Sequence, residues 1–202
     1  VDRRYLESKS PLRYVLGPLR ESITGTHLVS TITFNDRQAV RWQLALASEF
    51  LHESNLLVCD NSSSGAAADS IAKICDQQGV KYLRLPDNPW TGKNPSRSHG
   101  AAMNWVWHHL IRPARPKTFG FIDQDLYPIG PSTPHREIGE CGCFGDKRWS
   151  GHRWFLWAGY CFFDFESVIN QPLDFGLDWF AGLDTGGANW EVLYRHILSD
   201  SI

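Results

Sequence analysis

The chain has 202 residues, of which 42% are hydrophobic, and its formal net charge at pH 7 is −2. This length suits one domain with a substantial core, and the charge excludes the broad basic field that nucleic-acid binding requires. No run of about 18 apolar residues predicts a transmembrane helix, and the polar opening VDRRYLESKS does not resemble a signal peptide. We expect a cytoplasmic protein, with contact to the inner membrane surface and self-association left open.

Residues 28–130 alternate between predicted strands and helices, after a lead-in at residues 1–27 that has little pattern. Apolar, β-branched runs predict strands at residues 27–34, 55–60, 80–86 and 118–123. Helical spacing and capping residues predict helices within residues 35–53, 66–78 and 95–112. Such alternation is typical of a parallel sheet with right-handed crossovers, so we expect a Rossmann-like α/β fold.

The remainder of the chain has a different character. Residues 128–154 are rich in Gly, Pro and charge and predict loops around a site, whereas strand material returns at residues 153–165 and a helix is predicted at roughly residues 189–198. Five cysteines indicate free thiols in a reducing compartment. The CGC stretch at Cys141 and Cys143 matches no common zinc spacing, so we expect two free thiols in a loop.

Two aspartates end the fourth predicted strand, in the stretch TFGFIDQDLYPIG. Ligands of open α/β sheets bind beyond the carboxyl ends of the strands, and side chains two apart in a strand point to the same side. Asp123 and Asp125 would therefore converge, and a cation that prefers oxygen ligands, Mg²⁺ or Mn²⁺, would relieve their repulsion. The alternative is that the pair caps the following turn, where Asp is common.

Four segments, in order, resemble those of glycosyltransferases with the GT-A fold, in the family-2-like group. They are VSTITFNDR, LLVCDNSSSG, NPSRSHGAAMNW and FGFIDQDLYP, the last of which contains the DXD motif. The resemblance implies a nucleotide-diphospho-sugar transferase fold, with a mixed, mainly parallel sheet flanked by helices. It also implies a metal-dependent enzyme that moves a sugar to the hydroxyl of a sugar, glycan or lipid acceptor. Residues 131–202 would then form the acceptor-side, catalytic half of the same domain.

The resemblance further implies how the donor is held. The nucleotide base would be held by Thr33, Phe34, Asn35 and Asp60. A carboxylate at Asp60 would accept from an imide N–H and favour a uridine-diphosphate sugar, although Asp60 could instead cap the turn after it. Asp125 would bind Mn²⁺ or Mg²⁺ directly, while Asp123 would reach the ribose or a metal-bound water.

Two cations stand near the start of the third helix. At Lys93 and Arg97 a positive charge and exposed N–H groups would favour a phosphate, or both could be solvated loop charges. The Arg-Asn pair that the family has on this helix is replaced here by His99 and nearby polar residues.

An inverting transfer needs a base that takes the proton of the acceptor hydroxyl. By resemblance this is Asp184, in GLDTGGANWEVLYRH, with Asp178 as the substitute; Asp184 could instead cap the helix predicted after it. The acidic pair of the family is absent, since Leu183 precedes Asp184. His196 would be a third metal ligand or a packing residue. Walls of an acceptor site, or simply core, would be Trp149, His152, Trp154 and Trp157.

Three rival interpretations remain. A haloacid-dehalogenase-type phosphatase has its DxD near the first strand and Thr or Val at the position where Tyr127 stands. A sugar nucleotidyltransferase needs a Gly-rich basic loop after the first strand, where FNDRQAV has none. The third is a catalytically inactive GT-A-like binding or scaffold subunit. The intact Asp123 and Asp125 favour the transferase.

Overall fold

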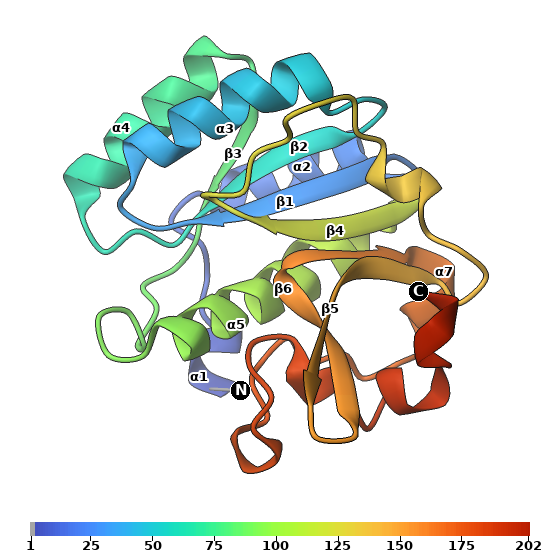
Figure 1. Ribbon diagram of the computed structural model, residues 1–202. Helices are drawn as coiled ribbons and strands as arrows, with labels where there is room; N and C mark the ends of the chain where they lie inside the picture. The colour runs from blue at the N-terminus through green and yellow to red at the C-terminus, as the bar shows by residue number, and fades with distance from the viewer. Residues whose placement is uncertain (1–2) are drawn as a thin grey trace.

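One six-stranded sheet has the strand order β3-β2-β1-β4-β6-β5 (Figure 1). The structure, a computed structural model, describes residues 3–202, except for the side chains of residues 13 and 201; the first two residues of the expected lead-in lie outside this range. The strands are β1 His27–Thr33, β2 Asn55–Asp60, β3 Lys81–Arg84, β4 Thr118–Asp123, β5 Cys143–Ser150 and β6 Arg153–Asp164. Strands β1 to β4 pair in parallel, whereas β6 is antiparallel to both β4 and β5. The predicted α/β fold with a mixed sheet is confirmed.

Helices cover both faces of this sheet (Figure 1). Helices α3 and α4 lie on one face, and α2 and α5 lie on the other. The helices are α1 Arg3–Leu6, α2 Leu16–Ile23, α3 Arg37–Phe50, α4 Gly65–Gln77, α5 Pro95–Val106, α6 Arg112–Ala114 and α7 Phe165–Val168. Three side chains cap them as good N-caps do: Asp36 on α3, Ser64 on α4 and Asn94 on α5.

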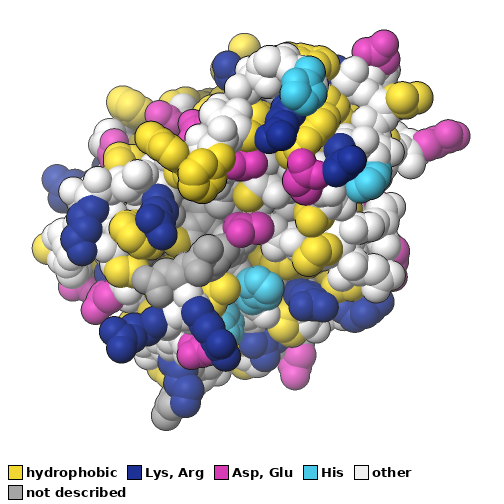
Figure 2. Space-filling model, turned by 90° about the horizontal axis from the view of Figure 1, so that it is seen from below, with side chains coloured by type: hydrophobic (Ala, Val, Ile, Leu, Met, Phe, Trp, Pro, Cys, Tyr) yellow, Lys and Arg dark blue, Asp and Glu magenta, His cyan; other side chains and the backbone are white. Residues whose placement is uncertain are grey.

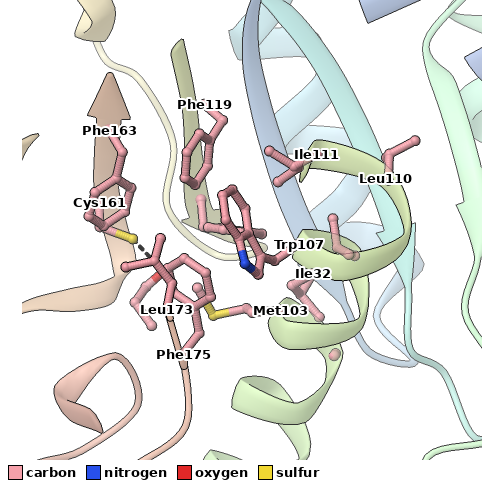
Figure 3. Close-up of a cluster of buried hydrophobic side chains, with 14 of the residues drawn as sticks. Ile32, Met103, Trp107, Leu110, Ile111, Phe119, Cys161, Phe163, Leu173 and Phe175 are labelled. Atoms are coloured by element: carbon pink, nitrogen blue, oxygen red, sulfur yellow. Dashed lines mark hydrogen bonds between the residues drawn. The ribbon is translucent and has the colours of Figure 1, made fainter. Parts of the chain in front are cut away.

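The main core lies between α5 and strands β4 and β6 (Figure 3). Trp107 stacks on Phe119 with ring centroids 5.1 Å apart, and Phe119 stacks on Phe163 at 5.2 Å. Tyr5 of the N-terminal segment and Tyr194 near the C-terminus are buried in the same cluster. Because apolar burial is the largest stabilising contribution, this shared core fixes α5 against the sheet and thereby places its first turn.

The third predicted helix runs past Pro113 and ends before Pro116. Helix α5 continues through a π-helical segment, Trp107–Ile111, into α6, and the chain turns only at Arg115, with φ of 53°. Proline has no N–H, so the carbonyl four residues earlier, that of His109, loses its helical partner. The guanidinium of Arg20 donates to this carbonyl instead, over 2.9 and 2.6 Å.

Two further predictions fail in the C-terminal third. Strand β5 lies inside the expected loop, where it pairs with β6 at the sheet edge, so its polar side chains remain solvated and Cys143 is in a strand. The helix predicted at residues 189–198 is absent: the segment holds short 3₁₀ turns at Gly187–Asn189 and Tyr194–His196. Tyr194 is buried against Trp154, at 5.0 Å between ring centroids, and this contact sets the path of the chain.

Within the part of the chain that the structure describes, none of the five cysteines forms a disulfide bond. Among residues 3–202, no helix is long and apolar enough to cross a membrane. In the face of the molecule seen in Figure 2, acidic and basic side chains are interspersed, so that face carries no broad field of a single sign.

Candidate active site

The carboxyl ends of β1 and β4 and the first turns of α5 enclose a pocket of about 390 Å³, here called the central pocket. Its lining residues are Ile32, Phe34, Asn61, Gly92, Pro95, Ser98, His99, Asp123, Gln124 and Asp125. A pocket beyond the carboxyl ends of parallel strands is where open α/β sheets bind ligands.

Asp123 and Asp125 both line the central pocket, but not for the reason that the sequence suggested. Strand β4 ends at Asp123, so Asp125 lies in the following turn and strand alternation does not align the two. The turn is held from α3, where the buried Gln43 donates through Nε2 to the carbonyls of Asp123 (2.7 Å) and Leu126 (3.0 Å). Gln43 was missed from sequence, since its one signal is a polar residue on the apolar face of a helix.

His99 faces the two aspartates from α5. Its Nδ1 lies 3.4 Å from Oδ1 of Asp123, and its buried Nε2 has no hydrogen-bond partner among the described residues. Burial lowers the pKa of His99, against the opposing pull of Asp123, Asp184 and Asp125. Burial also raises the pKa of Asp123; His99 opposes this, while Asp125 and Asp184 add to it. Three carboxylates therefore act on one pocket together with a neutral imidazole.

The residues expected to hold a base are only partly brought together. Phe34, 38% exposed, lines the central pocket, whereas Thr33 is buried. Asn35, with φ of 55°, binds the turn after β2 through its side chain. Its amide donates to Oγ of Ser63 (2.8 Å) and accepts from N–H of Ser64 (3.1 Å). Of the three, Phe34 alone is in position to stack on a ligand in this pocket.

Asp60 is fully buried, and its carboxylate already has three partners. Oδ2 lies 3.0 Å from the guanidinium of Arg84 and accepts from the Tyr82 hydroxyl (2.7 Å), while Oδ1 accepts from N–H of Ser62 (2.9 Å). The contact with Ser62 agrees with the alternative that Asp60 caps the turn after β2. The next residue, Asn61, lines the central pocket and donates to Oγ of Ser98 (3.0 Å).

The two cations near α5 do not line the central pocket. Lys93 is exposed, and the guanidinium of Arg97 stacks over Trp90, 3.5 Å from the ring centroid. Arg97 belongs to a second pocket of about 450 Å³, here called the Trp90 pocket. Its lining residues are Trp90, Asn94, Arg97, Ala101, Asn104, Asp174, Gly176, Leu177, Asp178, Trp179, Phe180 and Ala188.

Asp184 is exposed and lines a third pocket of about 380 Å³, here called the Asp184 pocket. Its other lining residues are Asn94, Ser96, Leu177, Trp179, Gly182 and Leu183. Oδ1 of Asp184 accepts from N–H of Thr185 (2.7 Å), and no long helix follows that it could cap. The neighbouring Thr185 donates through Oγ1 to the carbonyl of Ser96 (3.1 Å), which follows Pro95 of the central pocket, and the charge of Asp184 raises the pKa of Asp123.

The remaining candidates are scattered. Asp178 caps the turn at residues 179–181 and pairs with Arg153 at 3.8 Å, and His196 is exposed on a 3₁₀ turn outside the three pockets. Trp154 is core, whereas Trp149 and His152 are exposed in the β5–β6 hairpin. Trp157 lies close to Asp123 across Gly159. A Cβ on Gly159 would lie 2.4 Å from the Trp157 ring and 2.6 Å from Oδ2 of Asp123, so only glycine lets Trp157 and Asp123 approach each other here.

The donor set at the central pocket fits a hard divalent cation that takes part of its shell from a ligand. Within residues 3–202, no group of three or more His, Cys, Asp or Glu side chains could hold a metal ion. Asp123 and Asp125 nevertheless offer two carboxylates, and Mg²⁺ is commonly bound through one or two carboxylates, substrate phosphates and waters.

No protein-family model matches the chain, and no curated protein matches it at a significant level. Solved structures do. PcManGT, a mannosyltransferase from Pyrobaculum calidifontis in complex with GDP-Man and Mn²⁺, has a TM-score of 0.52 and 13% identity over 81% of this chain and 50% of that one. TarS of S. aureus has a TM-score of 0.37 and 16% identity over 55% of this chain and 18% of that one. The bifunctional glycosyltransferase WbbM has a TM-score of 0.45 and 13% identity over 72% of this chain and 32% of that one. The chain thus spans half or less of each of these proteins. Its strand order and its likeness to PcManGT show a GT-A-like glycosyltransferase fold.

Proposed function

We propose that this chain is a metal-dependent glycosyltransferase that moves a sugar from a nucleoside-diphosphate sugar to an acceptor hydroxyl. The charge of the central pocket carries this proposal. Asp123 and Asp125 line the pocket, Asp184 acts on it, and no Lys or Arg is among its described lining residues. A diphosphate would be repelled there unless a divalent cation stood between phosphate and carboxylate oxygens. Charge balance therefore supports metal dependence.

Each pocket residue then has a role. Asp123 and Asp125 would hold Mn²⁺ or Mg²⁺, which when bound neutralises charge on the departing diphosphate. Phe34 would stack on the nucleotide base, and Asn61, whose amide is bonded to Ser98 and Asn88, lines the same pocket. Uridine was expected because of Asp60, whose burial removes that support. Since PcManGT is in complex with GDP-Man, guanosine is the second donor base to test.

Asp184 is the proposed general base. Its carboxylate is exposed and uses only Oδ1 for the hydrogen bonds to Thr185. It lines a different pocket from Asp123 and Asp125, and we propose that an acceptor hydroxyl beside it attacks the sugar from the side away from the diphosphate. Attack from that side, with proton transfer to Asp184, would invert the configuration of the sugar.

Calorimetric titration of uridine diphosphate and guanosine diphosphate, with and without Mn²⁺, tests the proposal. The wild type should bind one of them only with Mn²⁺, and Asp125→Ala should abolish that binding. Asp69→Ala, which removes an exposed carboxylate on α4, is the matched control and should bind like the wild type. Binding of neither nucleotide by the folded protein would sink the proposal. Binding without transfer to any acceptor would favour the inactive scaffold subunit.

A further inference from the structure

We infer that the acceptor is an oligosaccharide and that it lies along a track formed by the Asp184 pocket and the Trp90 pocket. This inference rests on the proposed function, because the track begins at Asp184. It names the class of acceptor, which the central pocket does not reveal.

The two pockets adjoin each other around the start of α5. They share three lining residues, Asn94, Leu177 and Trp179. Asp184 lines only the first pocket, whereas Arg97 lines only the second. The central pocket takes other residues of the same helix, among them His99. A linear ligand whose reacting hydroxyl lies at Asp184 would therefore extend away from the donor, past Trp179, into the Trp90 pocket.

Two adjacent aromatic rings are held outward along this track. Trp179 is 75% exposed and Phe180 is 102% exposed, and both line the Trp90 pocket. The hairpin that bears them is closed by two backbone hydrogen bonds of 3.0 Å between Asp178 and Leu183, and the Asp178 side chain accepts from N–H of Ala181. The backbone that carries the rings is thus closed before a ligand arrives, and the exposed rings offer an apolar surface for the C–H face of a pyranose.

The facing walls offer the polar groups that sugar hydroxyls need. Arg97 stacks over the Trp90 ring, and the carboxylate of Asp174 lines the pocket beside Asn104, from which it accepts (2.6 Å). Aromatic faces combined with a few placed polar groups are typical of a ligand pocket.

A lipid is the poorer fit to these walls. The carboxylates of Asp174, Asp178 and Asp184 lie around the exposed rings, where an apolar tail would strip them of water and an anionic membrane surface would be repelled. A far more apolar pocket, of about 530 Å³, is lined by Val29, Ile122 and Phe162 on the face of the sheet opposite α5. An apolar ligand would be expected there rather than along the track.

The test measures saccharide binding and nucleotide binding separately. Mono- and trisaccharides of glucose, mannose, galactose and N-acetylglucosamine are titrated by saturation-transfer NMR against the wild type and the double variant Trp179→Ala, Phe180→Ala. We expect at least one trisaccharide to bind about tenfold tighter than its monosaccharide, with this advantage lost in the double variant and nucleotide affinity unchanged. Trp42→Ala, which removes an equally apolar ring that is 55% exposed on α3, should keep the advantage.

Each other outcome overturns the inference. Equal affinity for mono- and trisaccharides, an unaffected double variant, or no saccharide binding while the nucleotide still binds would refute the track and leave the proposed function standing. Binding to phosphatidylserine vesicles that the double variant loses would assign the hairpin to a membrane surface instead. Absence of nucleotide binding by the wild type is a separate result, and it would refute the proposed function.

Discussion

Asp60 and Asn61 are neighbours at the end of β2, and both side chains are buried. Asp60 lies opposite Arg84 in the register of β2 and β3 and forms a buried ion pair with it, while Asn61 lines the central pocket. From the sequence, the carboxylate is the stronger candidate, because an unpaired buried charge is costly. The partner that resolves this cost comes from another strand, so the spacing of residues along the chain could not reveal it.

We predict that Asp60→Asn acts on stability before it acts on ligand binding. The change leaves Arg84, whose side chain is 17% exposed, without its counter-charge, and breaking a largely buried pair costs roughly 3 kcal/mol or more. Urea unfolding measures this loss. Asp69→Asn, on the exposed face of α4, should change the free energy of unfolding by less than about 0.5 kcal/mol. Full stability of Asp60→Asn combined with lost nucleotide affinity would restore Asp60 as a base-binding residue.

At the scale of elements, the turn after β4 is held in place by α3 and by the end of β1. Gln43 of α3 holds the turn through two carbonyls, and Oε1 of Gln124 accepts from N–H of Phe34 at the end of β1 (2.8 Å). The DXD motif thus takes its geometry from α3 and β1. This geometry decides whether Asp123 and Asp125 can act on the same ligand.

Gln43 does not line the central pocket, yet Gln43→Leu is expected to weaken ligand binding there. Two buried carbonyls would lose their donor, at a cost of roughly 1–3 kcal/mol in stability. The displaced turn should reduce Mn²⁺-dependent nucleotide affinity by roughly 10- to 100-fold, as loss of a supporting hydrogen bond does in metal sites. Calorimetry and urea unfolding measure the two effects. Gln38→Leu, exposed on the same helix, should show neither. Unaltered nucleotide binding by a destabilised Gln43→Leu would mean that the turn is not part of the site.

Sequence patterns predicted the first four strands and helices α3 to α5 because each is marked locally. Apolar runs mark the strands, and Asn94 with Pro95 marks the start of α5. The failures depend on distant contacts. Strand β5 exists because β6 pairs with it, and α6 extends past Pro113 because Arg20 satisfies the carbonyl that the proline frees. The resemblance proposed Asp184 as a candidate, whereas the position of its pocket next to the Trp90 pocket needed the folded chain.

For the whole molecule, a histidine pair ties the sheet to the long segment after the DXD turn. His27, at the start of β1, stacks on His135 with ring centroids 3.8 Å apart, and His135 lies 3.4 Å from Glu53. Burial, His135 and Lys117 lower the pKa of His27 below its usual 6.5, with Glu53 opposing them. The folded state therefore favours neutral His27, at the end of the strand opposite the central pocket.

This shift contributes to the pH dependence of stability in the same direction as the lowered pKa values of His99 and His108. The unfolded chain takes up the His27 proton near pH 6.5, before the folded protein does, so stability is full above that pH and falls as the pH drops through the pKa of the folded state. We expect the urea midpoint of the wild type to fall between about pH 7.5 and about pH 5.5, and His27→Gln to reduce that fall. His52→Gln, exposed nearby, should leave it unchanged. An equal fall in His27→Gln would assign the pH dependence to other groups.

The bond from Arg20 to the His109 carbonyl has a consequence for how the chain can vary. The sheet begins only at His27, and the segment before it contributes no strand. Its Arg20 nevertheless donates to the His109 carbonyl, which Pro113 cannot do because it has no N–H. Proline at position 113 is tolerable only while arginine, or another long donor, occupies position 20. Substituting Pro113 by alanine would return the helical N–H and release position 20 to change. Two sites 93 residues apart are therefore expected to evolve as a pair, although neither touches the proposed substrates.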